Sequence, residues 1–184
     1  MKRFFNVRNT LILICLILLA ADMIFIFHNS AETAQESNEK STKIAETVAN
    51  IVVKDFDKME EPEKTEVLRK TDGIVRESAH MLEFVPLGFF LAAALLLWRT
   101  PEKKTGTLVI SGITVLSGIL YALTDELHQL AVDGRGFQLF DIMMDGTGAL
   151  LGCAAAVIVF LIITKKTASR KNEKNEKAKW SKKP

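Results

Sequence analysis

Four long apolar runs dominate this sequence and constrain its fold more than any other feature. They cover Leu11–Phe27, Met81–Trp98, Leu108–Leu123 and Ile142–Ile163, and densely charged stretches separate them. A helix needs about 20 apolar residues to cross the roughly 30 Å of bilayer hydrocarbon. Helices satisfy every backbone hydrogen bond internally, which lipid requires. The runs therefore predict an all-α fold, a polytopic transmembrane bundle with about four membrane-spanning helices.

The first apolar run resembles a signal peptide, but we expect it to be retained as a helix. Basic residues precede it, as they do in secretory signals. The sequence that follows it, HNSAETA, contains no good small-x-small cleavage site. The run is therefore counted as the first of the four spans.

The distribution of Lys and Arg predicts that both termini lie in the cytoplasm. Basic residues precede the first run, separate the second from the third and follow the fourth, whereas the loop before the fourth carries only Arg135. The residues that set this pattern ahead of the tail are Lys2, Arg3, Arg8, Arg99, Lys103 and Lys104. We accordingly divide the chain into a first transmembrane helix (1–27), an extracytoplasmic charged helical loop (28–79), three further transmembrane helices (80–164) and a basic cytoplasmic tail (165–184). The polar tail is expected to be disordered.

The charged loop is itself predicted to be helical. Its apolar residues recur at helical spacing, and Pro62 is expected to end that helix. The apolar stripe consists of Ile44, Val48, Ile51, Val52, Phe56 and Met59. A second helix, residues 63–78, should lead into the second transmembrane helix. Three placements stay open for the first helix: on the membrane surface, as a cap over the bundle, or solvated and packed on its neighbour.

Ionisable residues near the ends of the spans are predicted to gather in the outer half of the bilayer. Burying a charge in the bilayer costs free energy, so charged residues there usually have a functional or structural role. Helical spacing groups them into three faces, with Arg135 held above them by the glycine-containing turn 132–137. The faces consist of Arg76, His80 and Glu83; of Tyr121, Asp125 and His128; and of Asp141, Asp145, Gly148 and Gly152. The two glycines of the last face should let a neighbouring helix approach closely.

Spacing alone leaves three interpretations of this cluster open. Carboxylates beside histidines can perform acid–base chemistry in a ligand pocket. The same groups can ligate a divalent metal. They can also form buried ion pairs that only fix the register of the helices. The sequence identifies no cofactor, and we expect no nucleic-acid partner.

Three blocks of the sequence resemble the VanZ-like family of bacterial membrane proteins. They are MIFIFHNSAETAQESNEKS (23–41), RESAHMLEFVPLG (76–88) and YALTDELHQLAVDGRGFQLFDIMMDGTGALLG (121–152), and they follow one another in the family's order. Two departures stand out. Asp133 occupies a position where the family usually has Pro, and HNS replaces a Ser-rich triplet, so no role is assigned to Asn29, Ser30 or Gln35.

The resemblance implies a location and a site. By motif position, the family's polar residues fall on Arg76, His80, Glu83, Asp125, Glu126, His128, Gln129, Arg135, Asp141 and Asp145. The family's named member is associated with low-level resistance to the glycopeptide antibiotic teicoplanin, and such antibiotics act outside the cell. The resemblance therefore implies a multi-pass protein of the bacterial cell membrane, with an outward-facing site for an envelope component.

We therefore predict a pocket that binds or modifies a lipid-linked envelope precursor or a phospholipid headgroup. The candidate catalytic residues are His80, Glu83, Asp125 and His128, with either histidine as the base. The candidate ligand-binding residues are Arg76, Glu126, Gln129, Arg135, Asp141 and Asp145, because guanidinium groups match phosphate geometry. No metal ligand is assigned, and whether the protein is an enzyme stays open. The alternatives are a non-enzymatic accessory protein with a structural polar cluster, and a proton-coupled carrier.

Overall fold

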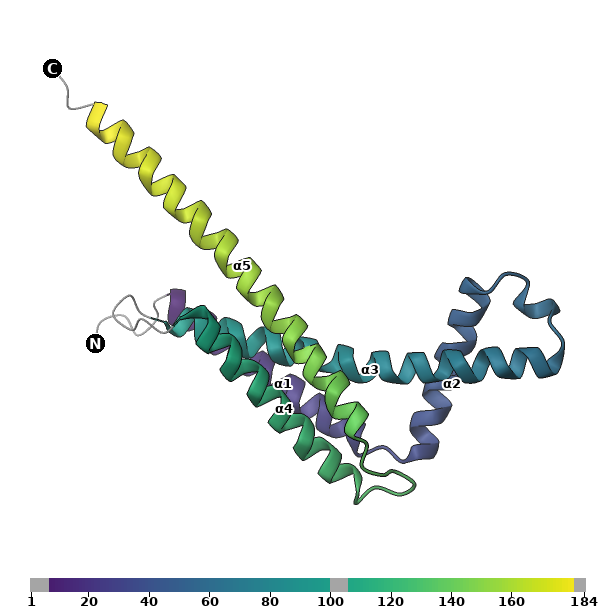
Figure 1. Cartoon of the computed structure of the whole chain (residues 1–184). Helices are drawn as coiled ribbons and strands as arrows, with labels where there is room; N and C mark the ends of the chain where they lie inside the picture. The colour runs from purple at the N-terminus through teal and green to yellow at the C-terminus, as the bar shows by residue number, and fades with distance from the viewer. Residues whose placement is uncertain (1–6, 100–105, 181–184) are drawn as a thin grey trace.

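All regular structure in the computed structural model, which describes residues 7–99 and 106–180, is helical. The elements are α1 (Val7–Ser30), α2 (Ala34–Val52), the short 3-10 helix η1 (Phe56–Lys58), α3 (Glu61–Trp98), α4 (Thr107–Gln129) and α5 (Leu139–Trp180) (Figure 1). Four of them, α1, α3, α4 and α5, are long and apolar enough to cross a membrane. The predicted all-α fold with four spans is confirmed.

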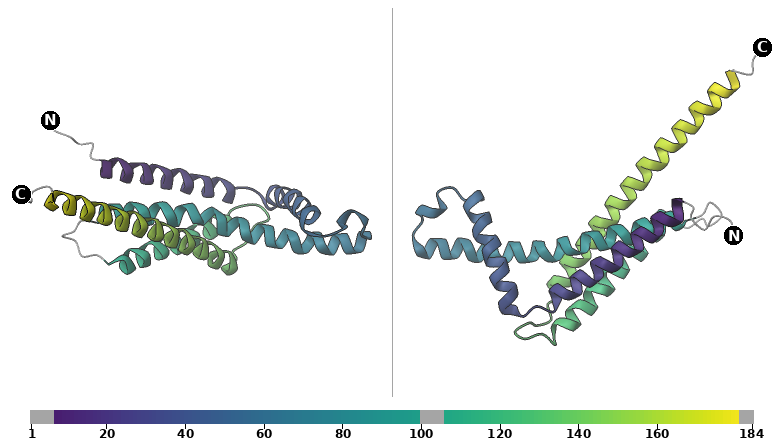
Figure 2. Two further views of the ribbon diagram at one scale, coloured as in Figure 1. Left: turned by 90° about the horizontal axis from the view of Figure 1, so that it is seen from above. Right: turned by 180° about the vertical axis from the view of Figure 1, so that it is seen from behind.

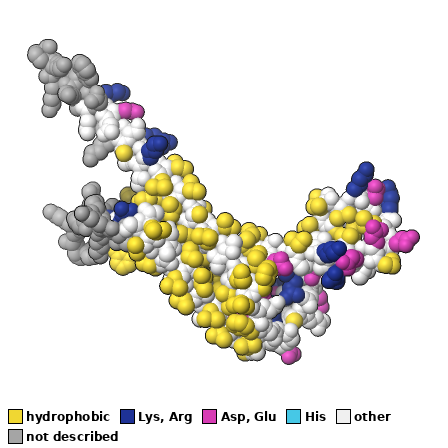
Figure 3. All heavy atoms as spheres, viewed as in Figure 1, with side chains coloured by type: hydrophobic (Ala, Val, Ile, Leu, Met, Phe, Trp, Pro, Cys, Tyr) yellow, Lys and Arg dark blue, Asp and Glu magenta, His cyan; other side chains and the backbone are white. Residues whose placement is uncertain are grey.

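The helices α3 and α5 make the most extensive contact in the fold, and α1 and α4 pack against this pair. Only 6% of the apolar window of α1 is buried, against 33% for α3 and for α5. Hydrophobic side chains therefore cover the outside of the bundle, as Figure 3 shows. An apolar surface of this extent is typical of a protein enclosed by lipid.

Both ends of the described chain lie at the same end of the bundle, where α1 begins and α5 ends (Figures 1 and 2). We call the opposite end, where α1 and α4 end and α5 begins, the polar end. This arrangement agrees with termini on one side of the membrane, but the side itself stays a prediction. Of the basic residues behind that prediction, Lys2, Arg3, Lys103 and Lys104 lie outside the described residues.

Glycines allow α5 to cross α3 at close range. A Cβ atom on Gly148 would overlap the carbonyl oxygen of Met81, and one on Gly152 would overlap that of Val85. Any residue with a Cβ atom would force the two backbones apart at such a contact. The close approach predicted for the Gly148–Gly152 stripe is confirmed, and α3 is the neighbour concerned.

Two helices are much longer than a bilayer is thick. At 1.5 Å per residue, the 38 residues of α3 and the 42 of α5 extend about 57 and about 63 Å. The start of α3 therefore projects beyond the polar end, and the end of α5 projects from the other (Figure 2). The disorder expected for the basic tail is wrong for residues 165–180. They continue α5 because Lys, Glu and Ala propagate a helix that the span has already nucleated.

The charged loop is helical as predicted, but its first helix is shorter and buries a different face. The helix α2 ends at Val52, well before Pro62, because the next residue, Val53, is extended with φ of −95° and ψ of 116°. Asp55 then adopts a left-handed conformation with φ of 57° at the start of η1. Its buried residues are Ser41, Ala45 and Ala49, beside the apolar stripe. Small residues are buried there because they let α2 lie close against α3.

Candidate functional site

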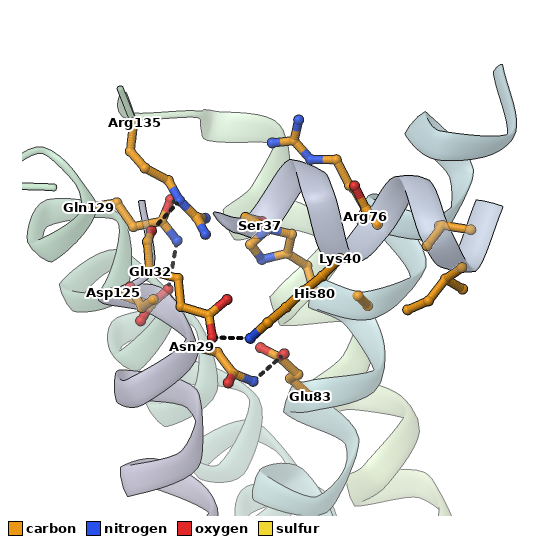
Figure 4. Close-up of a pocket in the computed structure, with 15 residues that line it drawn as sticks. Asn29, Glu32, Ser37, Lys40, Arg76, His80, Glu83, Asp125, Gln129 and Arg135 are labelled. Atoms are coloured by element: carbon orange, nitrogen blue, oxygen red, sulfur yellow. Dashed lines mark hydrogen bonds and ion pairs between the residues drawn. The ribbon is translucent and has the colours of Figure 1, made fainter. Parts of the chain in front are cut away.

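A pocket of about 220 Å³ lies at the polar end, between α2 and the ends of the spans (Figure 4). Each of α1, α2, α3 and α4 contributes side chains to it, and the α1–α2 and α4–α5 loops contribute one each. The lining residues are Asn29, Ser30, Glu32, Ser37, Lys40, Ser41, Ile44, Val75, Arg76, Ala79, His80, Glu83, Asp125, Gln129 and Arg135. Six of the ten predicted site residues are thus brought together: Arg76, His80, Glu83, Asp125, Gln129 and Arg135.

The start of α2 is fastened to the polar end by the α4–α5 loop. The Ala34 N–H donates to the Asp133 carbonyl at 3.2 Å, and Arg135 Nε donates to the Glu32 carbonyl at 3.0 Å. Between them Gly134 has φ of +72°, a conformation that favours glycine. The two loops form one clasp, which holds Arg135 beside the pocket as the sequence predicted.

Local chemistry also defines where α2 begins. Thr33 and Glu36 form a capping box, in which the Thr33 N–H donates to Glu36 Oε2 at 2.9 Å and the Glu36 N–H donates to Thr33 Oγ1 at 3.3 Å. The hydrogen bonds from the backbone and then the hydroxyl of Thr33 lower the pKa of the Glu36 carboxyl. This cap orients α2 across the pocket.

A chain of hydrogen bonds leads from Arg135 into the bundle. Arg135 Nη1 donates to Gln129 Oε1 at 3.4 Å, and Gln129 Nε2 donates to Asp125 Oδ2 at 3.2 Å. Gln129 and Asp125 are both buried, so the hydrogen bond between them replaces hydrogen bonds to water. The loop arginine and the Asp125 carboxylate are thereby linked through one side chain.

Arg76 and Arg135 line the pocket and lie above the carboxylates of Glu83 and Asp125 in the view of Figure 4. Arg76 Nη1 donates to Asn38 Oδ1 at 3.2 Å, and the acceptors of Arg135 are also uncharged. Within the described residues, neither guanidinium pairs with a carboxylate. Lys40, by contrast, is paired with Glu32. Two positive charges therefore face the pocket without an opposite charge in contact.

Acidic groups line the inner side of the pocket. The Glu83 carboxylate accepts a hydrogen bond from Asn29 Nδ2 at 2.8 Å, and Asp125 lies across the pocket from it on α4 (Figure 4). Both carboxylates are held by side-chain amides, Asp125 by that of Gln129. Both positive and negative groups therefore line the pocket, and the Lys40 ammonium lies among its carboxylates in Figure 4.

His80 connects the pocket with two acids of α5. Its Nε2 lies 3.8 Å from Asp141 Oδ2, and its Nδ1 lies 3.7 Å from Asp145 Oδ1. These distances exceed a hydrogen bond, so the contacts are electrostatic. Asp145 is fully buried, and neither of its carboxylate oxygens accepts a hydrogen bond from the described residues. Asp141 and Asp145 thus stand behind His80 and do not line the pocket.

His128 and Glu126 lie apart from the pocket. The His128 ring stacks on Phe27 with the ring centroids 4.5 Å apart, at the contact between α4 and α1. The buried Glu126 accepts a hydrogen bond through Oε2 from the Gln138 N–H at 2.6 Å, which anchors the α4–α5 loop. Packing and loop anchoring account for these contacts, but His128 Nε2 and Glu126 Oε1 are buried without a hydrogen-bond partner among the described residues.

Several lining residues were not predicted. Asn29 and Ser30 had no assigned role, and Glu32, Ser37, Lys40 and Ser41 were not considered. The spacing of Ser37, Ser41 and Ile44 places them on one helix face, which is the only signal that could have found them. That face was overlooked because its polar members interrupt the apolar stripe.

The metal interpretation finds no arrangement to support it. Among the residues that the structure describes, no group of three or more His, Cys, Asp or Glu side chains is placed to hold a metal ion. Asp141 and Asp145 instead meet His80 as a base between two acids.

Comparison with known proteins places the chain in a family. A family model described as VanZ/LLP1 matches residues 11–162, a range that includes every residue lining the pocket. No curated protein and no solved structure matches the chain. Since the match covers most of the sequence and four helices are apolar enough to cross a membrane, the protein is a multi-pass membrane protein that belongs to the VanZ/LLP1 family.

Proposed function

We propose that the pocket binds the phosphate group of an envelope lipid on the extracytoplasmic side of the membrane. The observation that carries the proposal is the pair Arg76 and Arg135. They come from a span and from a loop, they face the same pocket, and each donates only to uncharged oxygens. A planar guanidinium with no carboxylate partner is well suited to a phosphate.

The orientation follows from the basic residues of the sequence. The end of α5 that projects away from the pocket carries Lys165, Lys166 and Arg170, and positive charge favours the cytoplasmic side. The polar end then faces outward, where its opening meets the headgroups of the outer leaflet. A phospholipid headgroup and a lipid-linked envelope precursor both carry the phosphate that this pocket would hold.

Lipid retention by the purified protein tests the proposal. Wild type and the double variant Arg76→Gln/Arg135→Gln would be purified in detergent, and their bound lipids quantified by mass spectrometry. The matched control is Arg69→Gln/Lys70→Gln, which removes the same charge from an exposed ion-pair cluster of α3. We expect a phosphate-bearing lipid at a stoichiometric level in wild type and control, and its loss in the double variant.

A third variant separates binding from folding. Arg76→Lys/Arg135→Lys keeps both charges but loses the paired donors, so its retention should fall between wild type and the glutamine variant. Diacyl or polyprenyl masses would show which lipid is bound. Equal lipid content in all four proteins at equal thermal stability would contradict the proposal and leave the polar cluster with a structural role.

A second candidate function, acid–base chemistry on the bound group, is favoured by His80. It is the histidine that lines the pocket, and two carboxylates lie behind it at 3.7 and 3.8 Å. A histidine held in this way can take up or release a proton next to a ligand. Turnover per bound lipid in wild type, and its absence for the smaller amount of lipid that His80→Ala still holds, would establish this function.

The link to teicoplanin belongs to the same proposal. The family name is associated with resistance to this antibiotic, whose targets lie outside the cell. A protein that holds a lipid-linked precursor at the outer leaflet would change how much precursor the antibiotic reaches. Expression of the wild type should raise the inhibitory concentration of teicoplanin, and Arg76→Gln/Arg135→Gln should not. An equal effect of both proteins would remove this link.

A further inference from the structure

The helix α2 has an apolar surface that the bundle does not cover. One face, Ser41, Ala45 and Ala49, is buried against α3. On the next face Ile51 is 79% exposed and Val52 is 75% exposed. Neighbouring exposed apolar residues of this size usually mark a surface that something else covers.

The face of α2 that contains Ile51 lines the pocket in the first half of the helix and is exposed in the second half. In the first half of α2 it carries Ser37 and Ile44, which line the pocket. Val48 and Ile51 follow at spacings of four and three residues, so they continue the face in the second half. The side of α2 that covers the pocket therefore becomes purely apolar beyond it.

The placement of α2 points to the membrane as the covering partner. The clasp of Ala34 with Asp133, and of Arg135 with Glu32, fixes the start of α2 at the level where the spans end. From there α2 runs across α3 instead of continuing the axis of α1 (Figures 1 and 2). The projecting region shows hydrophobic side chains among charged ones (Figure 3). The helix thus crosses the end of a bundle whose own apolar sides require lipid.

We propose that the second half of α2 is an interfacial helix, with Val48, Ile51 and Val52 inserted among the lipids of the leaflet at the polar end. Its opposite face carries the exposed Glu39, Lys43 and Glu46, which would point to water. An apolar face opposite a charged one is typical of helices that lie in the membrane interface. Acidic residues outnumber basic ones in α2, so attachment rests on apolar contact and not on anionic lipid. The inference does not depend on the proposed ligand.

Depth measurement with a fluorescent probe tests this placement. Cys15 and Cys153, the free cysteines of the described chain, would be replaced by alanine. A single cysteine would then be introduced by Ile51→Cys or, as the matched control on the opposite face, Glu46→Cys, and labelled with an NBD group. The full chain would be reconstituted in phosphatidylcholine vesicles with or without brominated phosphatidylcholine.

We expect the label at position 51 to emit at shorter wavelength and to be quenched several-fold more by brominated lipid than the label at 46. Aqueous iodide should show the opposite order. Equal quenching of both labels by iodide, with none by brominated lipid, would overturn the proposal. A label at 51 protected from both quenchers until the protein is diluted in lipid would also overturn it, since a second copy of the chain would then cover the face.

Discussion

The contact between α3 and α5 and the pocket at the polar end are built on opposite principles. At the contact, glycines bring two backbones together and leave no room for a side chain. At the pocket, mostly polar and charged side chains from four helices and two loops enclose a cavity of about 220 Å³. The first region determines whether the bundle forms, whereas the second can change its chemistry while the bundle persists. Each prediction below tests this separation.

The largest effect should come from filling the helix contact. Gly152→Leu places a side chain against the Val85 carbonyl, so the backbones must separate. We expect a loss of about 3 kcal/mol or more in the free energy of unfolding, at the upper end for overpacking. Thermal stability in detergent would measure it. Gly112→Leu on α4 is the control, because a side chain there meets open space. Equal losses in both variants would show that the contact has no special role.

Opening the clasp should have a smaller and more local effect. Arg135→Ala removes the bonds to the Glu32 carbonyl and to Gln129. Hydrogen bonds from a charged donor are worth about 2 kcal/mol, and the spans should stay folded. We expect faster hydrogen exchange in residues 34–52, with exchange in α5 unchanged. Faster exchange throughout the bundle would mean that the two regions are not separate.

Alanine substitutions of His80 on α3 and His128 on α4 should affect different properties, lipid retention and stability. His80→Ala should reduce lipid retention because the pocket loses a lining residue and its contacts to α5. His128→Ala should retain lipid but lose about 1 kcal/mol of stability, the value of a stacked ring pair. Lipid mass spectrometry and thermal denaturation of both variants would check this. The reverse assignment would place the site around His128.

The smallest effect concerns the cap of α2. Because its pKa is lowered in the folded protein, the Glu36 carboxylate stabilises the helix start above its ordinary pKa, and this stabilisation is lost as the pH falls through the lowered value. Glu36→Gln should remove this pH dependence from hydrogen exchange at residues 34–37 and change little else. A wild-type helix start that exchanges equally at acidic and neutral pH, after correction for intrinsic rates, would contradict the role of the cap.

The sequence predicted the membrane bundle well because lipid imposes a simple rule. Spans show themselves as long apolar runs, and helical spacing correctly placed Arg76, His80 and Glu83 on one face. Helical spacing also identified Gly148 and Gly152. Two small residues on one helix face indicate a close helix contact, whichever helix the partner is.

The site was predicted only in part because spacing within a helix does not show which helix lies opposite. His128 shares a face with Asp125 by spacing, yet its ring turns to Phe27 of α1. Lys40 and Ser37 were missed because their role depends on the clasp that lays α2 over the spans. Local propensity likewise explains the helical tail, where composition alone suggested disorder.

Labelling of a single cysteine inside the pocket in intact cells shows whether the pocket faces outward and holds a lipid phosphate. Ser37→Cys, with Cys15 and Cys153 replaced by alanine, would be exposed to a membrane-impermeant maleimide. Slow labelling from outside, accelerated by Arg76→Gln/Arg135→Gln but not by Arg69→Gln/Lys70→Gln, is the predicted result, because an outward-facing pocket would lose its phosphate-bearing occupant. Labelling only after the cells are lysed, or equal rates in all three backgrounds, would contradict an outward-facing pocket that binds a lipid phosphate.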